Sequence, residues 1–223
     1  MKNFKRELKI TEDGSHTLFV PELNEHYHST HGAIQEAMHV YLNAGFDFCP
    51  QDPIHILEIG FGTGLNCFLT LTEAQKQKRT VIYHSIELYP IKEEHIQSLN
   101  YTDQIEGSDK DVFFKLHMAE WNQEVKITAD FTLNKLQGDL KEFNFPAKYD
   151  LIYFDAFAPD IQPELWTQDI FEKLYKHLKP DAILTTYSTK GIIKQALRGA
   201  GFEVKRLPGP PGKRQMLRAK KIE

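Results

Sequence analysis

Residues 57–66 read LEIGFGTGLN and carry three glycines at alternate positions: Gly60, Gly62 and Gly64. The apolar stretch His55–Ile59 predicts a buried strand before them, and the pattern of Leu65–Lys78 predicts a helix after them. Glycine at such a junction permits a tight turn and lets a ligand approach the backbone closely. We therefore expect a ligand-binding loop, with a glycine turn that binds nothing as the alternative.

The spacing of these glycines narrows the choice of ligand. A dinucleotide-binding fingerprint needs its third glycine one position later, where Leu65 stands, and the Lys-Ser or Lys-Thr pair of a phosphate-binding P-loop is missing. Glu58 stands two positions before the first glycine, where a carboxylate suits the ammonium group of a methionine moiety better than a pyrophosphate. Asn66, just after the loop, is expected to bind the same ligand as the glycines.

Strands and helices alternate from Pro53 onward, which predicts a parallel sheet with helices on both faces. The further strands are expected at Val81–Ile86, Phe131–Leu136, Leu151–Phe154, Ala182–Tyr187, Phe202–Leu207 and Gln215–Ala219. The last two surround the loop PGPPGKR, residues 208–214. Ligands of such sheets bind beyond the carboxyl ends of the strands.

Polar residues stand where three of these strands end. Glu87 ends one strand, and a carboxylate there can accept both hydrogen bonds of a ribose diol. Gly138 and Asp139 close the next strand, where a carboxylate could bind an adenine amino group, with an ordinary Asp turn as the alternative. Asp155 ends the strand Leu151–Phe154 and should face the reacting group of the ligand.

The segment DAFAPDIQPELW, residues 155–166, adds aromatic side chains to Asp155. Phe157 and Trp166 could enclose a flat substrate such as a base. Packing in the core is the alternative for each ring taken separately.

The composition fits one globular domain, with 223 residues of which 41% are hydrophobic. The N-terminal residues lack the apolar core of a secretory signal, and the longest apolar run, Leu151–Phe154, is too short to cross a membrane. Cys49 and Cys67 have no paired spacing, so neither a disulfide framework nor a cysteine zinc site is expected. A cytoplasmic protein without a membrane partner is expected.

The net charge of −4 is unevenly divided. From Lys190 onward, ten lysines and arginines stand against two glutamates, which gives +8 there and leaves −12 for the rest of the chain. A basic end on an acidic body is typical of a nucleic-acid-binding surface, and a solvated basic tail is the alternative.

The glycine loop and the acidic strand ends resemble those of class I methyltransferases. The resemblance implies a Rossmann-like α/β fold with a seven-stranded, mostly parallel sheet, an antiparallel last strand, and S-adenosylmethionine as cofactor. Residues 1–52 are expected to form an N-terminal extension whose helix, after EHYHSTHG (25–32), covers the active site. Residues 53–223 are expected to form the methyltransferase domain and to end in a basic hairpin, all in one compact unit.

A narrower resemblance is carried by several segments in combination: YHSTHGAIQEAMHVYL (27–42), LEIGFGTGLN, the Gly138-Asp139 strand end, DAFAPDIQPELW, and GKRQML (212–217). Together they resemble the bacterial tRNA methyltransferase family that completes 5-methylaminomethyl-2-thiouridine at the wobble position. In many bacteria this enzyme is the amino-terminal half of a bifunctional protein with a flavin-dependent oxidase, and the present chain resembles the stand-alone form. Ala156 departs from the glycine common in that family.

This resemblance implies a methyl transfer from S-adenosylmethionine to a primary amine of tRNA, and it leaves room for a separate oxidase acting upstream. Asp155 would be the catalytic residue, because it can orient the amine and stabilise the charge that forms on nitrogen. Tyr27 and His28 would close over cofactor and substrate, and either could instead act as a general base.

The basic hairpin also receives a role from the resemblance. Lys213 and Arg214 would hold tRNA phosphates while Phe157 or Trp166 receives the base. The nearby histidines at positions 26, 28 and 31 have irregular spacing without supporting cysteines or carboxylates, so no metal is expected.

Three other functions stay open at this point. An aminopropyl transferase of the spermidine synthase type has a similar sheet and also alkylates an amine, but it would need an acidic polyamine channel. A methyltransferase of small amines is the second. A module that binds cofactor and RNA without catalysis is the third.

Overall fold

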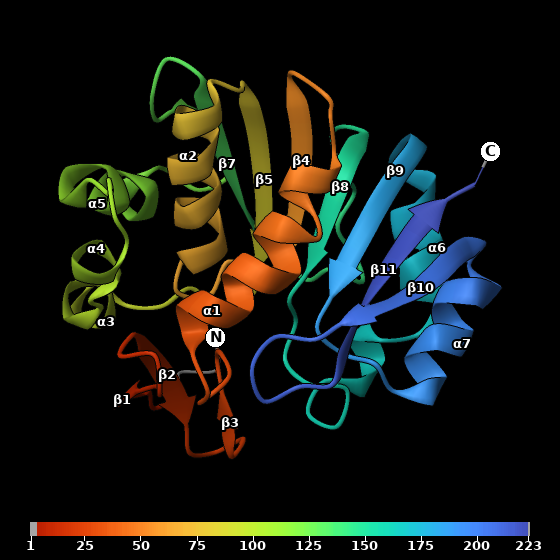
Figure 1. Ribbon diagram of the computed structural model, residues 1–223, viewed down its shortest axis with the longest axis horizontal. Helices are drawn as coiled ribbons and strands as arrows, with labels where there is room; N and C mark the ends of the chain where they lie inside the picture. Colours follow the sequence, from red (N-terminus) through yellow and green to blue (C-terminus); the bar gives the residue numbers. More distant parts are fainter. Residues whose placement is uncertain (1–3, 223) are drawn as a thin grey trace.

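An eight-stranded sheet forms the centre of the computed structural model, which describes residues 4–222 (Figure 1). The strand order is β10-β11-β9-β8-β4-β5-β7-β6. The strands are β4 (Ile54–Ile59), β5 (Val81–Glu87), β6 (Glu124–Lys126), β7 (Phe131–Gln137), β8 (Tyr149–Phe154), β9 (Leu178–Thr186), β10 (Phe202–Pro208) and β11 (Gln215–Lys221). The α/β class and the mostly parallel sheet predicted from the sequence are confirmed.

The strand directions match the predicted fold, with one strand more than expected. Strands β7, β5, β4, β8 and β9 pair in parallel, and β11 lies antiparallel between β9 and β10. The eighth strand, β6, pairs antiparallel with β7 at the edge of the sheet. It has three residues, two of them exposed, so it lacks the run of apolar residues that predicts a strand.

Helices cover both faces of the sheet because successive strand residues point to opposite sides. Ile56 packs in the core beneath α2, whereas its neighbour Leu57 packs in the core beneath α6 and α7. The helices of this part are α2 (Leu65–Gln77), α3 (Glu93–Ser98), α4 (Tyr101–Gln104), α5 (Lys110–Met118), η3 (Pro163–Leu165), α6 (Gln168–Lys176) and α7 (Gly191–Gly199).

The N-terminal segment forms a small sheet and a helical stretch of its own. Strands β1 (Glu7–Ile10), β2 (His16–Val20) and β3 (Glu25–His26) pair antiparallel, and α1 (Ala33–Ala37) continues into the π-helical turn η1 (Met38–Asn43), followed by η2 (Phe46–Phe48). In Figure 1 the small sheet, in red, lies at the end of the molecule where β4, β5 and β8 finish. This arrangement brings residues 25–30 to the carboxyl ends of the central strands.

Candidate active site

A cavity of about 440 Å³ lies at the carboxyl ends of β4, β5, β7 and β8. Most of the residues singled out in the sequence line it: Tyr27, His28, Gly60, Gly62, Asn66, Glu87, Gly138, Asp139, Asp155, Phe157 and Lys213. Glu58, Gly64, Trp166 and Arg214 are not among its lining residues. The cavity thus unites strand ends that are far apart in the chain, as a parallel sheet requires.

The glycine loop has a backbone conformation that other residues rarely adopt. The φ angles of Gly60, Gly62 and Gly64 are +93°, +51° and +73°. A Cβ atom on Gly60 would lie 2.8 Å from the backbone oxygen of Asp155, and one on Gly64 would lie 2.8 Å from His117 Nε2. The loop therefore needs glycine both for its dihedral angles and for its close contact with the end of β8.

Glu87 is held at the edge of the cavity by backbone donors. The N–H of Gly62 donates to its Oε2 at 3.1 Å, and the N–H of Tyr89 donates to its Oε1 at 2.8 Å. Each carboxylate oxygen can accept a further hydrogen bond, so both stay available to a ligand. The hydrogen bond from Gly62 to Glu87 also connects the glycine loop to the end of β5.

Gly138 and Asp139 form the next part of the wall. A Cβ on Gly138 would lie 2.9 Å from the ring of Phe143, so a side chain here would displace that ring. Asp139 accepts a hydrogen bond from the backbone N–H of Lys141 at 2.9 Å, as an Asp turn does. Asp139 nevertheless lines the cavity, and its Oδ2 pairs with the Lys141 ammonium at 3.4 Å.

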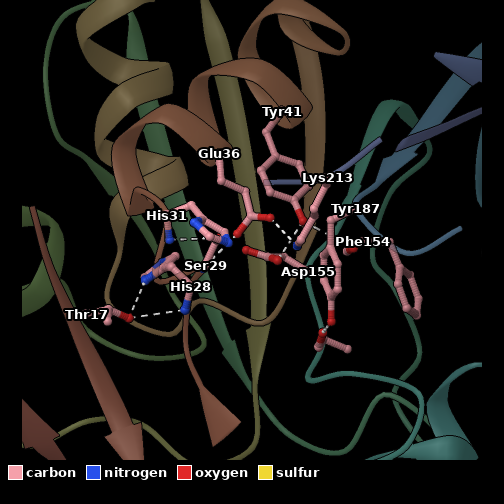
Figure 2. Close-up of polar contacts among 11 residues, drawn as sticks. Thr17, His28, Ser29, His31, Glu36, Tyr41, Phe154, Asp155, Tyr187 and Lys213 are labelled. Carbon is pink, nitrogen blue, oxygen red and sulfur yellow. Dashed lines mark hydrogen bonds and ion pairs between the residues drawn. The ribbon is translucent and has the colours of Figure 1, made fainter. Parts of the chain in front are cut away.

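The carboxylate of Asp155 is fixed by two side-chain donors. The hydroxyl of Tyr41 donates to Oδ1 at 2.6 Å, and the amide nitrogen of Asn66 donates to Oδ2 at 2.8 Å (Figure 2). Asp155 faces the cavity but is shielded from bulk solvent, and burial raises its pKa to about 6 while both hydrogen bonds lower it. It is therefore mostly ionised at neutral pH and rigidly oriented.

Sequence reasoning also missed the polar residues nearest to Asp155 and Lys213, which are Glu36, Tyr41 and Tyr187. Glu36 pairs with Lys213, and its Oε2 accepts the backbone N–H of Ser29 at 2.9 Å. Tyr187 comes just after β9. The Lys213 ammonium lies over the Tyr187 ring, 4.4 Å from the ring centroid. Tyr41 fits the apolar helical spacing of its segment, so no local signal distinguished it from a core residue.

Glu58 lies behind the cavity wall and not on it. The side chain is fully buried beneath α2, and the Ser85 hydroxyl donates to its Oε2 at 2.6 Å. Burial raises its pKa to about 8, so the group is mostly neutral at pH 7. Glu58 has no exposed surface and is not among the residues that line the cavity, so its contact with an ammonium group stays a prediction.

The expected substrate contact of Trp166 is corrected. Its indole is 4% exposed, packs edge-on against Phe154 with centroids 4.7 Å apart, and donates from Nε1 to the backbone oxygen of Phe157 at 2.9 Å. These contacts bury the ring in the core beside β8. Phe157 instead lines the cavity, with the Tyr27 ring edge-on at 5.1 Å.

His28 and Tyr27, the two alternative general bases, lie in different environments. Burial lowers the pKa of His28 to about 4, and its ring nitrogens lie 3.1 Å from Thr17 Oγ1 and 3.4 Å from Thr63 Oγ1. Burial raises the pKa of Tyr27 to about 12, and its hydroxyl oxygen accepts from Arg6 Nε at 2.8 Å. Neither group is therefore tuned to take a proton near neutral pH.

The two basic residues of the hairpin point in different directions. Lys213 turns into the cavity, whereas Arg214 is exposed. Within residues 4–222, no three histidine, cysteine, aspartate or glutamate side chains gather as metal ligands would. Over the same residues, no helix is long and apolar enough to cross a membrane.

The strand order and the glycine loop at the strand ends define the chain as a Rossmann-like α/β protein of the methyltransferase type. It belongs to the family of S-adenosyl-L-methionine-dependent methyltransferases, whose sequence model matches residues 100–222. Its cofactor is therefore S-adenosylmethionine.

Similar proteins narrow the comparison. The tRNA 5-methylaminomethyl-2-thiouridine biosynthesis bifunctional proteins MnmC of Azoarcus sp. (strain BH72) and Burkholderia multivorans are 30% and 31% identical over 96% and 94% of this chain. The chain spans about a third of their length, 35% and 34%.

Solved structures extend the comparison. The crystal structure of MnmC2 from Aquifex aeolicus has a TM-score of 0.80 at 26% identity, covering 98% of this chain and 71% of that one. Spermidine synthase from Thermotoga maritima, at 11% identity and a TM-score of 0.55, covers 99% of this chain and 82% of that one and shares the fold alone.

Proposed function

We propose that this protein methylates the primary amine of 5-aminomethyl-2-thiouridine at the wobble position of tRNA. The observation that carries an amine acceptor is Asp155, a carboxylate fixed by Tyr41 and Asn66 at the wall of the cofactor cavity. The names of the similar MnmC proteins support the tRNA substrate.

The cavity residues fit the cofactor. The close-packed glycine loop would admit a ligand against bare backbone, and Glu87 and Asp139, which line the cavity, would offer acceptors to a ribose diol and an adenine amino group. We assign Gly60, Gly62, Glu87, Gly138, Asp139 and Asn66 to hold it, with Gly64 shaping the loop from behind. Bound S-adenosylmethionine supplies a methyl group on a positively charged sulfur.

Asp155 acts by orientation and charge. An attacking amine must be neutral, and methylation leaves a positive charge on its nitrogen. With one lone pair of each oxygen held by Tyr41 and Asn66, the remaining lone pairs of Asp155 can accept from the amine in a fixed direction. The carboxylate then stabilises the ammonium product, since the charge forms beside it in a shielded cavity.

We propose that the N-terminal segment closes the cavity over the substrate. Tyr27 and Phe157 stand edge-on at the cavity wall, and an aromatic pair of this kind can receive a base that has left its stack. His28, held between two threonine hydroxyls, would support this wall. Residues 1–52 would then serve as the cover of a methyltransferase domain formed by residues 53–223.

We expect kcat/KM for methyl transfer to fall as the pH drops through about 6. Burial raises the pKa of Asp155 to about 6, so the carboxylate is present above that pH and is lost below it. The Tyr41 hydrogen bond lowers this pKa, so Tyr41→Phe should shift the acidic limb to higher pH. Profiles of kcat/KM against pH for both proteins check this, and an unshifted limb would assign it to another group.

Replacing Arg214 with glutamine should weaken tRNA binding and lower the slope of log affinity against log salt by about 1. The exposed guanidinium can neutralise one phosphate, whereas Lys213 faces the cavity. Lys110→Gln removes the same charge from α5, across the molecule from the hairpin, and is the matched control (Figure 1). Salt titrations of tRNA binding measure both, and equal slopes for Arg214→Gln and wild type would contradict a phosphate contact.

A transfer assay tests the proposed function. Labelled S-adenosylmethionine is incubated with tRNA carrying 5-aminomethyl-2-thiouridine, with the same tRNA lacking the aminomethyl group, and with spermidine-pathway amines. Label in the first tRNA alone is the expected result. Label in the amines instead would favour a small-amine methyltransferase, and no label anywhere would favour a binding module. A separate flavin-dependent oxidase acting upstream remains a prediction.

A further inference from the structure

The ammonium group of Lys213 lies beside a carboxylate in a part-buried region of the cavity. It pairs with the Glu36 carboxylate and lies over the ring of Tyr187, 4.4 Å from the centroid (Figure 2). Its side chain is 32% exposed, and all three residues line the cavity. Carboxylates and aromatic faces both bind alkylammonium ions in proteins.

The groups around the Lys213 ammonium are held in place by hydrogen bonds to other residues. The second oxygen of Glu36 accepts the Ser29 backbone N–H, and the Glu36 side chain is 10% exposed. The Tyr187 hydroxyl donates to the backbone oxygen of Ala156 at 2.8 Å, which anchors the ring next to Asp155. Lys213 comes instead from the loop between β10 and β11, so departure of its side chain would break neither of these two hydrogen bonds.

This ammonium site adjoins the catalytic carboxylate. Glu36 and Tyr41 come from the same helical stretch, and Tyr41 donates to Asp155. Figure 2 shows the side chains of Glu36, Asp155 and Lys213 pointing toward one another. The negative charge of Glu36 raises the pKa of Asp155 and the positive charge of Lys213 lowers it, so the three charges interact.

We propose that Glu36 and Tyr187 bind the protonated amine of the acceptor, and that Lys213 occupies this site until the acceptor displaces it. A lysine side chain ends in a methylene and an ammonium, the same group that an aminomethyl substituent carries. The acceptor amine would enter as its ammonium ion beside Glu36 and pass to Asp155 after losing a proton to solvent. This inference rests on the proposed function.

Binding of the nucleoside 5-aminomethyluridine tests the proposal without tRNA. Titration calorimetry would use protein saturated with S-adenosylhomocysteine, with uridine as the ligand that lacks the ammonium. Lys213→Met should bind 5-aminomethyluridine about tenfold more tightly than wild type, because it leaves Glu36 without its partner. Glu36→Gln should bind it about tenfold more weakly, and uridine binding should stay unchanged in both.

Two further variants make the result specific. The double variant Lys213→Met/Glu36→Gln should lose the gain of Lys213→Met, since that gain requires the carboxylate. Lys220→Met removes a lysine of the same hairpin that pairs with Asp181, and it should bind like wild type. If Lys213→Met binds 5-aminomethyluridine no more tightly than wild type, Lys213 is a permanent part of the site and the proposal is wrong. Failure of the proposed function appears separately, as wild-type protein that does not methylate the tRNA.

Discussion

Replacing Asp155 with asparagine should lower kcat for methyl transfer by about 10²- to 10³-fold, the range for loss of one group that stabilises charge in the transition state. The asparagine amide carries no charge to stabilise the ammonium product. In wild type, Tyr41 and Asn66 each donate to a separate carboxylate oxygen. Asparagine has one oxygen and one NH₂ group, so one of these two donors would lose its acceptor. Single-turnover transfer to tRNA measures the loss.

The cofactor should bind this variant nearly as well as wild type, because the glycine loop and Glu87 are unchanged. Calorimetric titration with S-adenosylmethionine checks this separation of binding from turnover. Asp160→Asn, an exposed change in the loop that follows Asp155, controls for the loss of one negative charge nearby. Turnover near the wild-type rate in Asp155→Asn would remove Asp155 from the mechanism.

Replacing Gly60 with alanine should weaken S-adenosylmethionine binding by about 100-fold, which corresponds to about 2.7 kcal/mol. Gly60 has a φ of +93°, and its Cβ would lie 2.8 Å from the backbone oxygen of Asp155. Backbone cannot yield as a flexible side chain does, so the loop or the end of β8 must move. Both belong to the cavity wall, and the free energy of unfolding should fall by about 1–3 kcal/mol as well.

Substitutions at two other glycines separate the effect of a positive φ angle from the effect of a close contact. Gly107 has a φ of +75° with open space around it, so Gly107→Ala should cost about 1 kcal/mol of stability and leave cofactor binding unchanged. Gly191 has neither a positive φ nor a close neighbour, so Gly191→Ala should leave cofactor binding unchanged and should not lower stability. Binding by Gly60→Ala that matches Gly107→Ala would show that the contact with Asp155 does not shape the cavity.

The strands β4, β5, β7 and β8 and the loop between β4 and α2 were predictable because their signals are local. Apolar runs and glycine spacing over about ten residues identify a strand, a turn and a helix. The same reasoning located Glu87, Gly138 and Asp155, since parallel strands carry their ends to one edge of a sheet. The edge strand β6 escaped prediction because three residues with two exposed side chains leave no pattern.

The direction of individual side chains depended on packing between distant segments. Glu58 and Trp166 stand in ligand-binding motifs, yet neighbouring helices and rings bury both. Glu36 and Lys213 are 177 positions apart and Tyr41 and Asp155 are 114 apart, so no periodicity of either segment predicts their contact.

The sequence by itself therefore determined the class of fold, the cofactor loop and the acidic strand ends, all of which follow from local patterns and the rules of parallel sheets. The tertiary structure alone decided which carboxylates face the cavity and which polar groups surround Asp155. The physical reason is that burial and hydrogen bonding of a side chain depend on what packs against it, and here that is a small N-terminal sheet, a helix and a hairpin from opposite ends of the chain.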